Sequence, residues 1–453
     1  MDKLECFKAY DIRGKVPEEI DANLAYKIGC AYADIINPGT VIVGYDVRLE
    51  SPMLAEAVIS GLMDCGVNVI NIGVCGTEEV YFHTFHKEQD GIGGGIMITA
   101  SHNPKGYNGM KMVKQGSRPM SGADDLKTIH DYVLENKKQM KTSSSYGKQV
   151  VQEDKSEYIE HLFGYINFAK IKPLKIVVNP GNGPAGAVLK LLEKHLPCEF
   201  IYINAEADGN FPNGVPNPML IENRVVTSDA VIAHNADLGV AWDGDFDRCF
   251  VFDERGSFIE GYYIVGLLAA SFLSKIAGSK IIHDPRLVWN TQDVVKKAGG
   301  IAVQSKSGHS FIKEKMRQED AVYGGEMSAH HYFKDFAYCD SGMLPWLLIA
   351  ELLSNSADKL STMVAKSQDA YPCSSEINYK VEDVSKTLSN IENYYKPQGA
   401  VIDYTDGLSI EFSDWRFNVR GSNTEPLLRL NLEVKGKNIS IAERIAEVEA
   451  III

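Results

Sequence analysis

A serine loop near the end of the first quarter of the chain has the composition of a phosphoryl-transfer site. Ser101 follows an apolar run at residues 96–99 and opens a stretch rich in Gly, Asn and Pro. Its polar neighbours are His102 and Asn103, and Lys111 is a nearby cation. Such a loop exposes a hydroxyl together with several backbone N–H groups. These residues predict a serine that accepts and donates a phosphoryl group, although a serine before Asn-Pro also suits an ordinary turn.

Three carboxylates alternate along a second loop, between two strand-like runs: Asp243, Asp245 and Asp247. Oxygen ligands at this spacing suit Mg²⁺, which takes few protein carboxylates and completes its shell with water or phosphate. The spacing partly imitates a calcium-binding EF-hand loop, but Arg248 stands where that loop needs Gly and the flanks are strand-like. A solvated acidic turn is the ordinary alternative, yet like charges at one strand end repel unless a cation offsets them. We therefore expect a magnesium loop.

Two further loops carry groups that suit a phosphorylated sugar. Within residues 323–333, Glu326 and Ser328 suit vicinal hydroxyls, and His330 suits proton transfer near neutral pH. Residues 420–426 read R-G-S-N-T-E-P and offer a guanidinium, hydroxyls, an amide and backbone donors for a phosphate dianion. The side chains concerned are Arg420, Ser422, Asn423 and Thr424. As isolated turns, both loops also suit a purely structural role.

The elements that must hold these loops form a repeated pattern. A strand-like run, a polar turn, a helical stretch and a second strand-like run recur three times, beginning near residues 40, 175 and 280. In the first copy we expect strands at 41–43 and 67–72 and a helix at 52–65. Each copy predicts a βαβ unit with parallel strands and a right-handed crossover. One large doubly wound sheet is the alternative to separate domains.

Breaks in this pattern divide the chain into four predicted domains. Residues 137–156 are polar with little apolar periodicity, residues 253–256 form a turn, and antiparallel strand patterns begin after residue 369. The expected fold class is α/β, with three tandem related α/β domains containing mixed or parallel sheets, followed by a smaller α+β C-terminal domain. The predicted boundaries are 1–150, 151–255, 256–369 and 370–453.

The composition narrows the classes of partner. A chain of 453 residues with 23% charged and 45% hydrophobic side chains is typical of a folded multidomain protein. Its formal net charge of −14 disfavours non-specific binding to nucleic acid or to an anionic membrane. The eight cysteines are scattered without a C-x-x-C pair, as in reduced cytosolic proteins. Neither a signal peptide nor a bilayer-length apolar run is recognisable. We therefore expect a cytoplasmic protein with no nucleic-acid or membrane partner.

Together the four loops resemble those of the α-D-phosphohexomutase superfamily, in the family's order and across essentially the whole chain. The resemblance assigns a phosphoserine loop, a metal loop, a sugar loop and a phosphate loop. These are T-A-S-H-N-P at 99–104, D-G-D-F-D-R at 243–248, G-E-M-S-A-H at 325–330 and R-G-S-N-T-E-P at 420–426. The family has three related α/β domains and a smaller fourth domain, which agrees with the repeat pattern.

Single residues outside the long motifs also match cleft positions of that family. The segment F-K-A-Y-D-I-R-G resembles the family's opening and implies that Tyr10 and Arg13 lie near the active cleft. Arg248 and His309 match positions that line the cleft. Arg286 stands where some relatives have Lys, and a guanidinium scarcely deprotonates. The resemblance therefore implies a binding role for Arg286 instead of proton transfer.

The resemblance implies an intramolecular phosphotransferase that depends on Mg²⁺ and acts on small hexose phosphates. It would interconvert mannose 1-phosphate and mannose 6-phosphate through phospho-Ser101 and a 1,6-bisphosphate, with glucose or mannose 1,6-bisphosphate as activator. The G-E-M-S sequence at 325–328 and the residues that follow it, 329–333, resemble the bacterial phosphomannomutase/phosphoglucomutase branch. This resemblance implies activity on glucose phosphates and supply of GDP-mannose synthesis. The alternatives are phosphoglucomutase as the main activity, a Mg²⁺-dependent phosphatase, or a non-catalytic phosphosugar-binding protein. We expect a monomer or a homodimer.

The resemblance also distributes roles among the residues. The implied catalytic residues are Ser101, His102, Arg248, His309 and His330. The implied metal ligands are Ser101, Asp243, Asp245 and Asp247. The implied substrate-binding residues are Tyr10, Arg13, Lys111, Arg286, Glu326, Ser328, Arg420, Ser422, Asn423 and Thr424.

Overall fold

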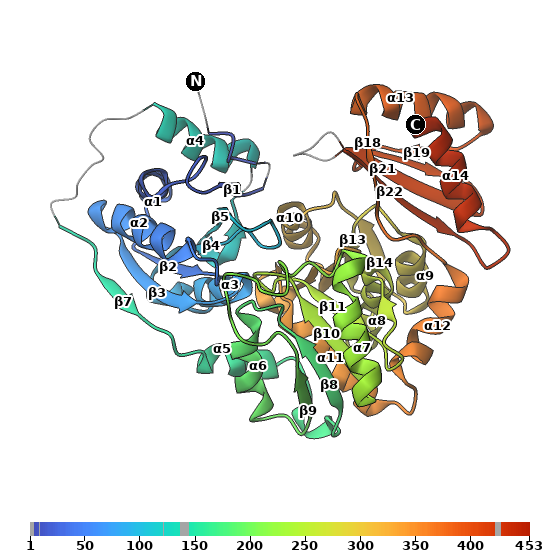
Figure 1. Ribbon diagram of the computed structural model, residues 1–453, viewed down its shortest axis with the longest axis horizontal. Coiled ribbons are helices and arrows are strands. Elements are labelled where there is room, and N and C mark those ends of the chain that lie inside the picture. Colours follow the sequence, from blue (N-terminus) through green and yellow to red (C-terminus); the bar gives the residue numbers. More distant parts are fainter. Residues whose placement is uncertain (1–3, 9, 121, 136–144, 422–426) are drawn as a thin grey trace. The chain divides into compact units, whose positions relative to one another are not determined.

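The described residues form four β-sheets, and the chain divides into two units (Figure 1). The computed structural model describes residues 4–8, 10–120, 122–135, 145–421 and 427–453. The first unit holds residues 1–258 and 335–357, and the second unit holds residues 259–334 and 358–453. The strands of residues 12–252 lie in the first unit, and those of residues 280–333 and 377–434 lie in the second unit.

The first sheet of the first unit is mixed, with strand order β1-β5-β4-β2-β3-β7 and β6 beside β5. Strand β2 is parallel to β3 and β4, whereas β5 is antiparallel to β4 and β1. The strands are β1 Ile12–Lys15, β2 Thr40–Tyr45, β3 Asn68–Val74, β4 Ile92–Ile98, β5 Tyr107–Lys114, β6 Arg118–Pro119 and β7 Gln149–Val151. The helices are α1 Ala22–Ile36, α2 Ser51–Asp64, α3 Thr77–His86 and α4 Lys127–Leu134.

Alternating strand residues feed two separate cores on the two faces of this sheet. Val41 and Val43 pack into the cluster that includes residues of α1, α2 and α4, while Ile42 belongs to the cluster with Val80 of α3. Helix α1 begins at the cap Asp21, whose side chain accepts a hydrogen bond from Leu24 N. These cores fix the strand ends that carry the loops.

The second sheet of the first unit has the order β12-β11-β10-β8-β9. Strand β8 is parallel to β9 and β10, and β10 forms an antiparallel pair with β11. Its strands are β8 Lys175–Asn179, β9 Glu199–Tyr202, β10 Leu238–Trp242, β11 Cys249–Phe252 and β12 Phe258–Ile259. The accompanying helices are α5 Ser156–Phe163, α6 Ala185–Glu193 and α7 Val225–His234, and the returning segment adds β17 Cys339–Asp340 and α11 Met343–Asn355.

Glu78 on α3 anchors the segment that returns to the first unit. Its carboxylate is completely buried and accepts hydrogen bonds from one tyrosine and from three groups at the start of α11. The donors are Tyr158 Oη at 2.5 Å, Ser341 Oγ at 2.7 Å, Gly342 N at 2.5 Å and Met343 N at 3.1 Å. Burial is the dominant effect and raises the pKa of Glu78 to about 8.

The first sheet of the second unit contains the order β14-β13-β15-β16. Strand β13 is parallel to β14 and β15, and β15 is antiparallel to β16. These strands are β13 Lys280–His283, β14 Ile301–Gln304, β15 Tyr323–Gly325 and β16 His331–Phe333. The helices are α8 Gly261–Lys275, α9 Trp289–Lys297, α10 His309–Glu319 and α12 Leu360–Ala370.

The last sheet is antiparallel throughout the described pairs, with order β18-β22-β21-β20-β19. Its strands are β18 Ile377–Lys380, β19 Val401–Asp403, β20 Leu408–Glu411, β21 Trp415–Gly421 and β22 Leu427–Val434. Helices α13 Val384–Tyr395 and α14 Ile441–Ile452 cover one face of this sheet and share its core (Figure 1). The buried carboxylate of Glu433 on β22 accepts from Tyr262 Oη, Val288 N at 2.7 Å and Arg416 Nη1 at 2.9 Å, which ties this sheet to α8 and α9.

The expected fold class is confirmed, because three βαβ-containing sheets precede an antiparallel C-terminal sheet. The expected strand at 41–43 is β2, the helix at 52–65 is α2, and the strand at 67–72 is β3. The alternative of one large doubly wound sheet is wrong, since the strands of the described residues divide into four sheets. The exact domain boundaries stay a prediction.

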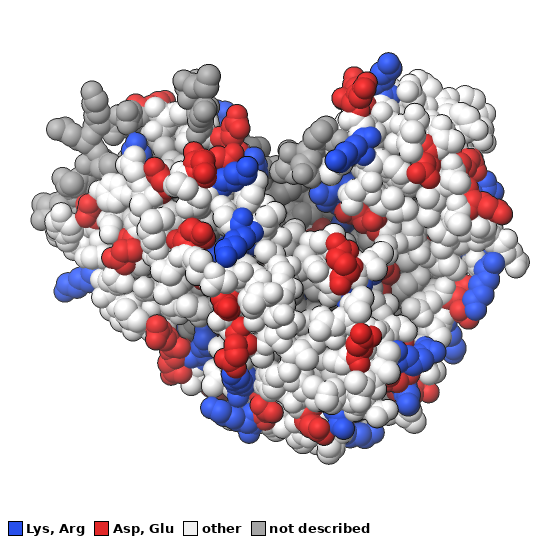
Figure 2. Space-filling model, viewed as in Figure 1, with Lys and Arg blue, Asp and Glu red and all other residues white. Residues whose placement is uncertain are grey.

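Acidic and basic side chains are interspersed over the visible face of the molecule (Figure 2). Among the helices of the described residues, none combines the length and apolar character needed to cross a membrane.

Candidate active site

Ser101 lies directly beyond the end of β4, in a backbone conformation that few side chains adopt. Its φ is 50°, in the left-handed region, and the residue is 1% exposed. Its backbone N–H donates to Thr99 Oγ1 at 2.8 Å. Its side-chain Oγ donates to Asp243 Oδ2 at 2.8 Å and lies 3.0 Å from His102 Nδ1. The structure therefore joins the serine loop to the aspartate loop through the hydroxyl that the sequence singled out.

The aspartate loop connects the antiparallel strands β10 and β11 of the second sheet. Asp243, Asp245 and Asp247 are all buried, and each has a carboxylate oxygen within 4.8 Å of the others. Gly244 lets the two loops approach, because a Cβ at this position would lie 2.2 Å from the carbonyl oxygen of Ser101. The three carboxylates thus converge beside Ser101.

Lys111 on β5 supplies the cation that these carboxylates need. Its Nζ lies 2.7 Å from Asp245 Oδ2 and 2.5 Å from Asp247 Oδ2. Thr77 Oγ1 also donates to Asp245 Oδ2, at 2.5 Å. Burial opposes the charge on Lys111, but Asp245 and Asp247 outweigh it and raise the pKa of the ammonium. Burial likewise opposes the charge on Asp245, and Lys111 and Thr77 lower the pKa of that carboxyl.

Asp243 has the opposite electrostatic environment. Burial first, and then the charges of Asp247 and Asp245, raise the pKa of Asp243 to about 7. Within the described residues, the buried atoms Asp243 Oδ1 and Asp245 Oδ1 have no hydrogen-bond partner. Buried carboxylate oxygens without donors are suited to a cation. The residues present therefore fit a Mg²⁺ ion, whose charge would relieve the repulsion around Asp243.

Two arginines and a histidine surround the serine and Asp243. Arg248 Nε lies 3.4 Å from Asp243 Oδ2, and Arg13 Nη1 donates to Asn103 Oδ1 at 2.7 Å. Burial, with Arg248 as the next cause, lowers the pKa of His102 well below its usual value, which keeps the imidazole neutral at neutral pH. Tyr10 is half-buried in the turn before β1. These positive and neutral groups would suit a phosphorylated serine.

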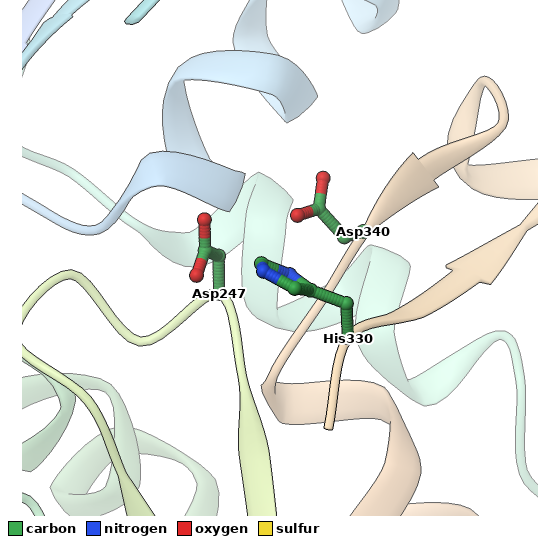
Figure 3. Close-up of side chains that lie close together, drawn as sticks. All are labelled: Asp247, His330 and Asp340. Carbon is green, nitrogen blue, oxygen red and sulfur yellow. The ribbon is translucent and has the colours of Figure 1, made fainter. Parts of the chain in front are cut away.

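Asp340 is a further carboxylate of this region that the sequence did not reveal. It is completely buried on β17, and its carboxylate lies within 4.8 Å of that of Asp247 (Figure 3). His330 is also drawn in Figure 3, and it belongs to the second unit. Asp46, Arg48 and Thr77 were missed as well. The available signal was their position, since all three follow the carboxyl ends of strands β2 and β3, where ligands bind in α/β sheets.

The second unit gathers several of the other predicted residues around Arg286. Its buried Nη2 lies 2.8 Å from Asp284 Oδ2, 3.2 Å from Glu326 Oε1 and 3.1 Å from Ser328 Oγ. Burial opposes the charge, but Asp284 and Glu326 outweigh it and raise the pKa of Arg286. Glu326 Oε1 also accepts from Gly308 N at 2.9 Å, which places the start of α10, at His309, next to the sugar loop.

Two further predicted residues lie elsewhere in the second unit. Arg420 is the next-to-last residue of β21 and donates from Nη2 to Glu376 Oε2 at 3.1 Å. His330 is 7% exposed, and its backbone carbonyl accepts from Glu326 N at 2.9 Å. The rest of the predicted phosphate loop, Ser422, Asn423 and Thr424, lies outside the described residues.

Comparison with known proteins gives a consistent match over the whole chain. Models of the alpha/beta/alpha domains I, II and III of phosphoglucomutase/phosphomannomutase match residues 4–140, 156–256 and 260–371, and the C-terminal domain model matches 376–451. The "phosphohexose mutases" protein of Xanthomonas campestris pv. campestris is 54% identical over 449 residues, or 98% of each chain. A phosphomannomutase of Escherichia coli is 52% identical over 458 residues, covering 100% of both chains.

Solved structures show the same fold. A phosphoglucomutase/phosphomannomutase family protein of Burkholderia thailandensis has a TM-score of 0.88 and 31% identity, covering 99% of this chain and 96% of that one. An N-acetylphosphoglucosamine mutase of Aspergillus fumigatus, solved with GlcNAc-6P and magnesium, has a TM-score of 0.62 at 14% identity. The second likeness is one of fold alone.

Proposed function

The chain belongs to the phosphoglucomutase/phosphomannomutase family, and from this premise we propose that it interconverts mannose 1-phosphate and mannose 6-phosphate. The observation that carries the proposal is the hydroxyl of Ser101, 2.8 Å from Asp243 beside three convergent buried carboxylates. A serine in this position can store a phosphoryl group next to a divalent cation. The reaction is then an isomerisation in which the phosphate on the sugar changes its position.

The proposed cycle begins with phospho-Ser101. The free hydroxyl of the hexose monophosphate attacks the phosphorus, the bond between phosphorus and Ser101 Oγ breaks, and a hexose 1,6-bisphosphate forms. After the sugar has reversed its orientation, Ser101 Oγ attacks its other phosphoryl group, the bond between that phosphorus and the sugar oxygen breaks, and the isomeric monophosphate leaves. Asp243, Asp245, Asp247 and phospho-Ser101 would hold Mg²⁺, which supplies charge compensation for the transferring group. Arg248 and Lys111 act as fixed cations of the first unit.

We assign recognition of the sugar and of its non-reacting phosphate to the second unit. Glu326 and Ser328 bind the 3- and 4-hydroxyls, and Arg286 holds these two side chains through its contacts of 3.2 and 3.1 Å. Arg420 binds phosphate together with Ser422, Asn423 and Thr424. His330, with His309 as the second candidate, moves the proton of the attacking hydroxyl. Tyr10 and Arg13 complete the proposed set of substrate ligands.

This assignment predicts activity on both mannose and glucose phosphates. The 3- and 4-hydroxyls have the same configuration in the two sugars, so Glu326 and Ser328 do not distinguish them. We propose mannose phosphates as the main substrates, supply of GDP-mannose synthesis as the use of the product, and glucose or mannose 1,6-bisphosphate as activator. A cytoplasmic location, a monomeric or homodimeric state, and domain boundaries after residues 150, 255 and 369 are part of the same proposal.

The test follows mannose 1-phosphate by ³¹P NMR in the presence of Mg²⁺ and a trace of glucose 1,6-bisphosphate. We expect mannose 6-phosphate to accumulate without inorganic phosphate, and glucose 1-phosphate to react as well. Ser101→Ala is expected to abolish conversion, whereas Ser156→Ala, at an exposed serine of the first unit, leaves it unchanged. Release of inorganic phosphate would indicate a phosphatase, and unchanged substrate would indicate a binding protein; either result refutes the proposal.

A further inference from the structure

Arg48 is a buried arginine that holds the serine loop through the loop's own backbone. It lies between β2 and α2, is 2% exposed, and has the ring of Phe211 5.3 Å from its guanidinium carbon. Its two terminal nitrogens donate to four carbonyl oxygens of the loop that carries Ser101. The acceptors are Ser101 O and Asn103 O at 2.7 Å each, and Pro104 O and Tyr107 O at 3.1 Å each.

A second chain of contacts leads from Arg48 to the other side of the same serine. Asp46 Oδ2 lies 3.3 Å from Arg48 Nε and accepts from Thr99 Oγ1 at 2.7 Å. Thr99 Oγ1 in turn accepts from Ser101 N at 2.8 Å. Ser51 Oγ donates to Asp46 Oδ1 at 2.6 Å, which holds the carboxylate in place. Both backbone polar groups of Ser101 are therefore attached to one buried ion pair.

The conformation of Ser101 explains why such support matters. A φ of 50° is unfavourable for a residue with a side chain, so the loop needs contacts that hold it there. In this conformation Oγ lies 2.8 Å from Asp243, and Gly244 packs against the serine carbonyl. A planar guanidinium can donate to four carbonyls from its two terminal nitrogens while it forms an ion pair with a carboxylate, and a lysine ammonium with three donors cannot.

We propose that Arg48 is a positioning residue for phosphoryl transfer, which keeps Ser101 aimed at the aspartate loop in both its free and its phosphorylated form. The proposal rests on the proposed function, because it concerns the same serine. Arg48 donates to the backbone carbonyl of Ser101 and not to its Oγ, so its contribution passes through that carbonyl and, by way of Asp46 and Thr99, through the N–H. A phosphoserine that changed its aim between the two half-reactions would lose the alignment that transfer requires.

The test compares Arg48→Lys with Arg255→Lys, a matched change at an arginine whose side chain is 65% exposed. For R48K we expect kcat to fall about 10²-fold, as for a misplacement of the reacting group of about 1 Å, with KM for mannose 1-phosphate within about threefold of wild type. Amide hydrogen exchange of residues 100–107 should rise in R48K and not in R255K. Thr99→Val, which removes the hydroxyl that links Asp46 to Ser101 N, should lower kcat about tenfold.

The outcomes separate positioning from a general loss of structure. A wild-type kcat in R48K, or a loss of kcat without faster exchange in residues 100–107, would overturn the proposal. If R48K does not fold, Thr99→Val decides: a lowered kcat with unchanged KM supports positioning, and an unchanged kcat refutes it. If the wild-type protein neither converts mannose 1-phosphate nor carries phosphate on Ser101, the proposed function is refuted. Amide hydrogen exchange in residues 100–107 of the variants then tests by itself whether Arg48 holds the serine loop: faster exchange in R48K supports this role, and unchanged exchange refutes it.

Discussion

Replacing Lys111 by Met should destabilise the first unit strongly, because it removes the ammonium between two buried carboxylates. The contacts of 2.7 Å to Asp245 and 2.5 Å to Asp247 are each worth roughly 6 kcal/mol of Coulomb attraction at an effective dielectric constant of about 20. The cost of removing the ammonium from water offsets much of that gain. Breaking a buried ion pair by deleting one partner nevertheless costs about 3–5 kcal/mol, since the other charge stays buried.

Thermal unfolding of the full chain in metal-free buffer measures this cost. We expect Lys111→Met to lower the midpoint for the first unit by roughly 6–15 °C. Mg²⁺ should then raise the midpoint of the variant, because a bound cation restores positive charge among the three aspartates. Lys114→Met is the control, since Lys114 lies on the same strand, pairs with Asp125 at 2.9 Å and is 36% exposed, so we expect less than about 1 kcal/mol. Equal midpoints for the two variants would refute the electrostatic reasoning.

Three further predictions concern contacts within the units. Gly244→Ala should lower kcat at least about tenfold with little effect on thermal stability, because its Cβ would meet the Ser101 carbonyl at 2.2 Å; wild-type steady-state kinetics would contradict this. Burial raises the pKa of Glu78 from 4.5 to about 8, so the stability it contributes is complete below pH 4.5 and is lost as the pH rises toward 8. Glu78→Gln cannot titrate and should show a smaller fall in melting temperature between pH 5 and pH 8 than wild type; parallel curves would exclude Glu78 as the source. Glu433→Ala removes the carboxylate that accepts from Val288 N, Arg416 and Tyr262, and it should destabilise the second unit by about 3–5 kcal/mol. Faster amide hydrogen exchange in α8 and β22 would show this loss, and unchanged exchange would contradict the prediction.

The sequence was sufficient for the parts of the fold that depend on local patterns. The βαβ repeats appear in the alternation of apolar runs and turns, and strands β2, β8 and β13 begin at or beside the residues where these runs begin. The same holds for the serine and aspartate loops. Ser101 and Asp243 are 142 residues apart, yet each motif was recognisable by itself, and the structure brings the two side chains to 2.8 Å.

The sequence did not predict the residues whose roles depend on contacts between segments that are far apart in the chain. Arg48 has no motif of its own, and its role depends on four carbonyl groups that are 53 to 59 residues away in the sequence. Asp340 and Glu78 are similar cases, because single carboxylates have no recognisable spacing and become informative only when burial and donors are known. The two ion pairs of Lys111 depend on the strand order β4-β5, which places β5 beside the strand that carries the serine loop.

Intact-mass analysis of the full chain tests the central claim most directly, namely that Ser101 stores the phosphoryl group. After incubation with Mg²⁺ and glucose 1,6-bisphosphate, followed by removal of the small molecules, the wild-type protein should carry the mass of one phosphoryl group, located on Ser101 by peptide fragmentation. The mass should return to that of the unmodified chain when mannose 1-phosphate is added in excess. Ser101→Ala should carry none. An unmodified wild-type protein, or phosphate on another residue that persists in Ser101→Ala, would contradict the account.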